Sequence, residues 1–147
     1  MASSQPLPST RRIVTAHNDD GKQLSDTTVD SLPPDVNTTE DRGLAATGLS
    51  NNGTIVRIVD FPPKSTGLMH RSMTLDYVYV LQGEVILALD DGSATVVKAN
   101  QTVVQQATMH RWDNATDEWA RMLVVLIASK KPVVNGTVLD KDVPFNV

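Results

Sequence analysis

Two histidines are the residues of this sequence best suited to moving protons near neutral pH. His70 lies in the segment GLMHRSMTLDY and His110 in QQATMHRWDN, and each adjoins a run of β-forming residues. An imidazole has an unperturbed pKa of about 6.5, so it can accept or donate a proton in this range. The chain contains no cysteine, which excludes thiolate nucleophiles and thiolate metal sites. A serine nucleophile is not indicated, because the sequence has no nucleophile-elbow motif.

Asp76 follows His70 by six residues, an even spacing that places both side chains on one face if this segment is extended. Side chains alternate along a strand, so His70, Ser72, Thr74 and Asp76 would share one face. Two imidazoles and a carboxylate suit either acid–base catalysis or a divalent metal ion. A third alternative is structural: Asp76 would then only bind backbone amides at the entrance of the strand.

The elements expected to position these groups are short runs of β-branched residues, each closed by turn residues. The runs are 54–61, 76–83, 84–90, 94–98, 101–106 and 120–129. Their spacing of about ten residues predicts an antiparallel sandwich or barrel, and Asp91-Gly92 predicts a hairpin. No helical periodicity is sustained, so the predicted fold class is all-β. Histidines at matching ends of neighbouring strands would meet at the barrel mouth, where binding sites are common.

The chain before residue 54 differs in composition from the rest. Residues 1–10 are small, polar and proline-containing, and they predict a disordered tail. Residues 11–53 predict a strand and an irregular arm, and residues 54–147 a barrel with a C-terminal extension. The run DYVYVL is apolar on both faces. We therefore expect a second subunit to cover its outer face, which predicts a homodimer.

Charge and hydropathy exclude several kinds of partner. The net charge is −4, and lysine and arginine are scattered without a basic stripe, so no nucleic-acid partner is expected. No apolar run approaches the roughly 20 residues that span a bilayer. The first ten residues lack the apolar core of a signal peptide. We expect a cytoplasmic protein whose partner is a small molecule.

The segment around His70 resembles the first cupin motif. That motif has a histidine, a second histidine two residues on, then an acidic residue and a glycine seven residues beyond it. Here these places hold His70, Ser72, Asp76 and Gly83, and His110 takes the histidine position of the second motif. The wider stretch is similar to the small single-domain cupins of filamentous fungi, several of which are encoded in polyketide-type biosynthetic clusters.

The resemblance implies a cupin fold, which is a double-stranded β-helix or jelly-roll barrel with an N-terminal arm. Metal-binding cupins typically use three histidines and a glutamate, whereas Ser72 and Asp76 stand at two of these places. His70, His110 and Asp76 could still hold zinc, iron or manganese as a two-histidine, one-carboxylate set. In the favoured interpretation no cofactor is required, and the same three residues are the catalytic acids and bases.

The expected function is therefore that of a lyase of fungal secondary metabolism. A dehydratase, decarboxylase or isomerase acting on a polyketide-like or aromatic molecule fits these groups. The residues expected to contact this molecule are Ser72, Thr74, Val78, Val80, Ile86, Trp112 and Val124. Two alternatives remain, a non-catalytic cupin binding module and a metal-dependent cupin oxygenase.

Overall fold

The computed structural model of the chain describes residues 5–10, 14–17, 23–27 and 53–142. Every regular element in these ranges is a β-strand, which confirms the all-β fold class. The strands are β1 (Val14–His17), β2 (Gln23–Thr27), β3 (Thr54–Phe61), β4 (Ser65–Thr66), β5 (Thr74–Gln82), β6 (Glu84–Leu89), β7 (Ala94–Lys98), β8 (Thr102–Gln106), β9 (His110–Asn114), β10 (Ala120–Ala128), β11 (Val133–Val134) and β12 (Thr137–Val138). None of the described residues belongs to a helix long and apolar enough to cross a membrane.

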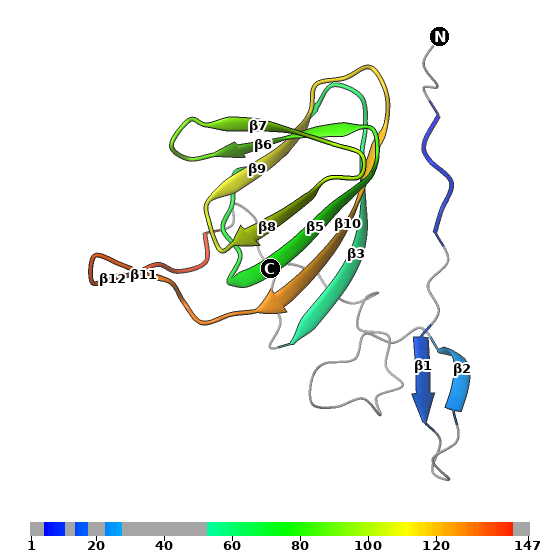
Figure 1. Ribbon diagram of the computed structural model, residues 1–147, viewed down its shortest axis with the longest axis horizontal. Helices are drawn as coiled ribbons and strands as arrows, with labels where there is room; N and C mark the ends of the chain where they lie inside the picture. The colour runs from blue at the N-terminus through cyan, green and yellow to red at the C-terminus, as the bar shows by residue number, and fades with distance from the viewer. Residues whose placement is uncertain (1–4, 11–13, 18–22, 28–52, 143–147) are drawn as a thin grey trace.

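Two antiparallel sheets form the barrel. One has the strand order β3-β10-β5-β8 and the other β4-β9-β6-β7. Figure 1 shows them as two layers, with β6, β7 and β9 facing β8, β5, β10 and β3. Consecutive strands are exchanged between the layers, since β5 and β8 lie in one sheet and β6, β7 and β9 in the other. This arrangement is the jelly-roll sandwich expected from the sequence.

The core lies between the sheets because alternate residues of β5 and β10 point inward. Val78 and Val80 are buried on β5, as are Met122, Val124 and Leu126 on β10. Each such side chain contributes about 1.5–3 kcal/mol through its burial. The core cluster consists of Ile55, Val78, Val80, Val85, Val97, Trp112, Ala120, Met122, Val124 and Leu126.

Most strands lie where the β-branched runs predicted them. The predicted runs 54–61 and 94–98 coincide with β3 and β7, and the others agree with their strands to within two residues. The hairpin at Asp91-Gly92 is confirmed, because it joins β6 to β7 and Gly92 has a φ of 85°. A positive φ at this position is what the glycine supplies.

The strand β9 was missed, and His110 lies in it. His110 follows β8, which ends at Gln106 as expected, and it is also the first residue of β9. The segment HRWDN has little intrinsic β-propensity. Its pairing with β6 nevertheless buries the alternate residues His110, Trp112 and Asn114. Asn114 is fully buried and donates to the carbonyls of Phe61, Pro62 and Glu118.

The outer face of β5 is open in the described part of the chain. Tyr77 is 45% exposed and Leu81 is 43% exposed, although a cover was expected there. Within the predicted arm, β1 and β2 pair as an antiparallel hairpin. The remainder of that arm, residues 28–52, lies outside the described residues, as do residues 1–4 of the predicted tail.

Candidate functional site

A cavity of about 220 Å³ opens between the two sheets. It is somewhat smaller than the roughly 300–1,000 Å³ typical of ligand pockets, so it suits one small molecule. Strands β3, β5 and β10 supply one wall, and β9 with the segment before β5 supplies the other. The lining residues are Arg57, Val59, Phe61, Gly67, Leu68, His70, Ser72, Asp76, Val78, His110, Trp112, Met122, Val124 and Leu126.

The two predicted histidines line this cavity side by side because their backbones are hydrogen-bonded to each other. The amide of His70 donates to the carbonyl of His110 and the amide of His110 donates to the carbonyl of His70, both at 2.9 Å. Residues paired in this way carry their side chains on the same face. The ring centroids of His70 and His110 are consequently 4.4 Å apart, with an angle of 49° between the ring planes.

Both imidazoles are held by the same kind of hydrogen bond. The Nδ1 atom of His70 lies 2.8 Å from the carbonyl oxygen of Leu68. The Nδ1 atom of His110 lies 3.0 Å from the carbonyl oxygen of Thr108. A carbonyl oxygen only accepts, so we assign the hydrogen of each neutral ring to Nδ1. Each Nε2 atom then carries a lone pair that can accept a proton.

The environment of His110 keeps its ring neutral at physiological pH. The pKa of His110 is lowered to about 4. Burial is the main cause; the hydrogen bond to the Thr108 carbonyl raises the pKa, and the nearby charge of His70 lowers it. The ring also contacts Trp112 edge-on, with centroids 6.3 Å apart. A positive charge on the adjacent ring of His70 therefore disfavours protonation of His110.

Asp76 contributes a carboxyl group whose protonation is easier than usual. Burial raises its pKa, and a hydrogen bond from Thr74 and the charge of His70 offset part of this effect. Its Oδ1 atom is buried and has no hydrogen-bond partner among the described residues. A carboxyl group in this state can hold a proton for a ligand in the cavity.

Most, but not all, of the predicted contact residues line the cavity. Ser72, Val78, Trp112 and Val124 do so, together with the three predicted catalytic residues. The three that do not are Thr74, Val80 and Ile86.

Each of the three exceptions has a physical reason. The Thr74 hydroxyl lies 2.8 Å from the hydroxyl of Ser72, and Thr74 is buried within the wall. Val80 is fully buried deeper in the core, one step further along β5. Ile86 pairs with the exposed Val96, so it points outward while its neighbour Val85 points inward. Strand periodicity gives the face of a residue, but it does not give its depth in the barrel.

Several lining residues were not predicted, and two of them matter for chemistry or shape. Arg57 lies on β3 with the inward parity of Ile55 and Val59. Gly67 donates its amide to the Trp112 carbonyl at 3.1 Å, and an added Cβ would lie 2.4 Å from that oxygen. The other unpredicted lining residues are Val59, Phe61, Leu68, Met122 and Leu126. Knowing which face of β3 is buried would have identified Arg57.

The donor groups around the histidine pair bear on the metal set that the sequence allowed. The part of the chain that the structure describes has no group of three His, Cys, Asp or Glu side chains that could hold a metal ion. The tentative set of His70, His110 and Asp76 is therefore not assembled as a three-ligand site. Ser72 lies in the cavity wall, and its hydroxyl is bonded to Thr74.

Comparison with known proteins agrees with the fold. Residues 57–126 match the cupin domain family, and this span includes both histidines and Asp76. This stretch of the chain is similar to a cupin domain. An uncharacterized conserved protein from Klebsiella pneumoniae with a double-stranded β-helix domain has a similar fold. Its TM-score is 0.51 at 18% identity, over 65% of this chain and 79% of that one.

Proteins similar to this chain occur in fungi. Phomopsin biosynthesis cluster protein C' from Diaporthe leptostromiformis is 39% identical over 59% of this chain and 47% of its own length. The cupin-domain-containing oxidoreductase virC from Hypocrea virens is 38% identical over 58% and 45%. Oryzines biosynthesis cluster protein J from Aspergillus oryzae is 26% identical over 88% and 89%. The chain spans about half the length of the first two relatives, and the expected resemblance to fungal biosynthetic cupins is confirmed.

Proposed function

We propose that this cupin is an enzyme of fungal secondary metabolism that moves protons on a small molecule bound in the cavity. The reaction class is that of a lyase or isomerase, with dehydration as the favoured case. The observation that carries the proposal is the contact between the rings of His70 and His110, each with Nδ1 held by a backbone carbonyl. The names of relatives from the phomopsin and oryzines clusters support the metabolic setting.

In the proposed reaction, the Nε2 atom of one imidazole removes a proton from a carbon of the substrate. The electron pair of the broken C–H bond forms a C=C bond, and the bond from the neighbouring carbon to a hydroxyl group breaks. Asp76, or the other imidazole, gives the departing hydroxyl a proton, so the products are an alkene and water. The raised pKa of Asp76 favours its role as the acid. The imidazolium then returns its proton to the group that acted as the acid, either directly or through a water molecule, and this restores the starting protonation states.

The walls of the cavity support this chemistry. Phe61, Leu68, Trp112 and Met122 line it, and all four are apolar. An apolar wall excludes bulk water from the reacting atoms and strengthens electrostatic interactions among them. It also suits an aromatic or polyketide-like substrate rather than a sugar.

A second candidate function is an oxidation, which the names of several relatives favour. Four relatives with 35–38% identity are called cupin-domain-containing oxidoreductases. An oxidation needs an electron acceptor in addition to the two histidines, whereas a dehydration needs none. A third candidate, a non-catalytic binding module, is favoured by the serine at position 72.

One experiment separates the three functions. The encoding gene is deleted in its host, and the metabolite that accumulates is incubated with the purified chain, with and without a chelator. A product lighter by one water molecule, formed equally in both conditions, supports the proposal. A product that has lost two hydrogens or gained oxygen supports the oxidoreductase. A metabolite that binds without being converted supports the binding module.

A further inference from the structure

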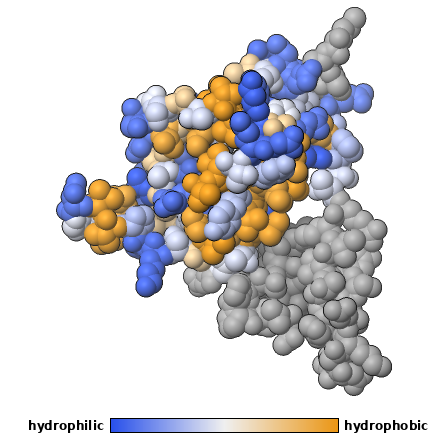
Figure 2. Space-filling view, in the orientation of Figure 1, coloured by the Kyte–Doolittle hydropathy of each residue, from blue (hydrophilic) through white to orange (hydrophobic). Residues whose placement is uncertain are grey.

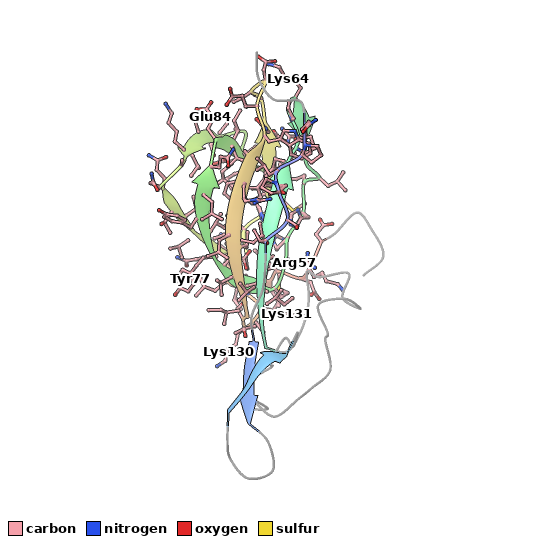
Figure 3. The ribbon with its side chains drawn as sticks, turned by 90° about the vertical axis from the view of Figure 1, so that its right-hand side faces the viewer. Arg57, Lys64, Tyr77, Glu84, Lys130 and Lys131 are labelled. Atoms are coloured by element: carbon pink, nitrogen blue, oxygen red, sulfur yellow. The ribbon has the colours of Figure 1, made fainter. Side chains whose placement is uncertain are left out.

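Arg57 places a positive charge on the inner wall of the cavity. On β3 it is paired with Val124 of β10, which is paired in turn with Val78 of β5. All three of these residues line the cavity, while the neighbours of Arg57 on either side, Val56 and Ile58, are exposed on the outer face. The guanidinium is therefore part of the cavity wall (Arg57 is labelled in Figure 3).

This guanidinium has no hydrogen-bond or ion-pair partner within the described part of the chain. Two other arginines show the usual arrangement: Arg121 is bonded to Asp60 at 2.6 Å and Arg111 to Asp113 at 2.9 Å. Arg57 is the one lysine or arginine among the residues that line the cavity, and Asp76 is the one carboxylate.

The two charged groups of the cavity are kept apart by the sheet. Asp76 is paired with Leu126, whereas Arg57 is paired with Val124, so they occupy different rows on β5 and β3 with β10 between them. Two strand spacings of about 4.8 Å separate their strands. The carboxylate of Asp76 therefore does not neutralise Arg57, and the space between them is available to a ligand.

A guanidinium in a partly apolar cavity is only weakly solvated, so a bound anion stabilises it. Its planar pair of N–H groups matches the two oxygens of a carboxylate. We propose that Arg57 binds a carboxylate of the substrate, so that the substrate is a small apolar molecule bearing one carboxylic acid. This inference rests on the proposed function, because it assumes that the substrate occupies the same cavity as the histidine pair.

The position of Arg57 gives this contact a consequence for the reaction. A carboxylate held on β3 directs the rest of the molecule across the cavity, toward His70 and His110 on the opposite wall. Proton removal from a carbon next to the carboxylate increases negative charge on its oxygens. A fixed guanidinium stabilises that charge in the transition state.

The test measures binding and does not require turnover. Ligand-observed NMR and calorimetry of the full chain are run with trans-cinnamate, with other aromatic and aliphatic carboxylates, and with the neutral cinnamamide. We expect cinnamate to bind more tightly than the amide. Arg57→Gln should weaken cinnamate binding by about 10- to 100-fold, the loss of a charge-assisted pair, and leave amide binding unchanged. Lys98→Gln is the matched control, because it removes the same charge from an exposed position on β7.

Two results would overturn the proposal. One is cinnamate binding by the folded Arg57→Gln protein that equals binding by the wild type. The other is the failure of every carboxylate to bind the wild type at millimolar concentration. Arg57→Lys, which keeps the charge, should retain part of the affinity and so separates a charge effect from misfolding. His70→Ala and His110→Ala should still bind cinnamate, so a failure of the catalytic proposal would leave this result unaffected.

Discussion

His70 and His110 exchange both of their backbone hydrogen bonds, and this pairing sets their rings 4.4 Å apart. The main chains of two segments 40 residues apart in sequence therefore fix the contact between the rings. The carbonyls of Leu68 and Thr108, each two residues before a histidine, orient the two rings. Such a site is rigid before any ligand arrives. Preorganised groups of this kind are what proton-transfer catalysis requires.

The first prediction concerns the pH dependence of stability. The pKa of His110 is about 4 in the folded chain and about 6.5 in an unfolded one. The unfolded chain therefore takes up the proton first, and stability is lost as the pH falls from 6.5 toward 4. Between pH 7 and pH 5 this loss is about 2 kcal/mol. In urea unfolding experiments, the free energy of unfolding of His110→Gln should change less between pH 7 and pH 5 than that of the wild type. An equal change in the two proteins would contradict the lowered pKa of His110.

Asp76 should show a conflict between stability and activity. Its carboxylate is buried, its pKa is raised by burial, and Oδ1 has no partner among the described residues. Burial makes Asp76 costly to ionise, which also keeps its acid form available for proton transfer. Asp76→Asn replaces it with a neutral amide of similar shape and removes that cost, so the free energy of unfolding at pH 7 should rise by about 1–2 kcal/mol. The stability contribution of Asp76 itself runs opposite to that of His110: it is present at low pH and lost as the pH rises through the folded pKa.

The same variant should lose turnover because an amide cannot donate the proton that the departing hydroxyl needs. We expect a loss of about 10²-fold in kcat. Denaturation and kinetics on one preparation check both effects. An Asp76→Asn protein that is destabilised and fully active would show that the carboxylate is structural only.

Gly67 should be intolerant of even one added methyl group. A Cβ at this position would lie 2.4 Å from the Trp112 carbonyl oxygen, so the backbone must move and the hydrogen bond to Trp112 is lost. Gly67→Ala should reduce the free energy of unfolding by about 1–3 kcal/mol. Thr66→Ala, at the exposed neighbouring position, should change it by less than about 0.5 kcal/mol. Equal effects of the two variants in urea titrations would contradict the packing account.

Assembly is the next prediction. The outer face of the β3-β10-β5-β8 sheet exposes Val56, Ile58, Tyr77, Leu81 and Val104. Figure 2 shows apolar side chains gathered over the region where Figure 1 places β5 and β10. The charged groups on this face include Asp60 and Arg121, which neutralise each other in an ion pair at one end of β3 and β10. The exposed apolar residues are complementary to a second copy of the same face, so we expect another chain to cover them in a two-fold dimer.

Light scattering checks the dimer directly. The wild type should have twice the chain mass of 15.9 kDa, and Tyr77→Arg should shift it to the monomer because it places a charge in the contact. The mass of one chain at all concentrations of the wild type would refute the prediction.

The sequence predicted the strands and the histidine pair because both depend on local patterns. Runs of β-branched residues mark strands, and the positions of His70 and His110 beside such runs indicated that they would meet. The strand β9 was missed because tertiary pairing, and not propensity, makes HRWDN extended. Arg57 was missed because TIVRIVDF is apolar on both faces, so the pattern cannot show which face is inside. Thr74 and Val80 lie on the inward face of β5, as predicted, but beyond the part of that face that lines the cavity.

The central claim is that the pair of His70 and His110 transfers protons, and turnover of the accumulated metabolite by single variants tests it most directly. We predict that His70→Ala and His110→Ala each remain folded and lose about 10²- to 10⁴-fold in rate. The wild type should keep its rate after treatment with a chelator. Wild-type turnover by both histidine variants would contradict the claim.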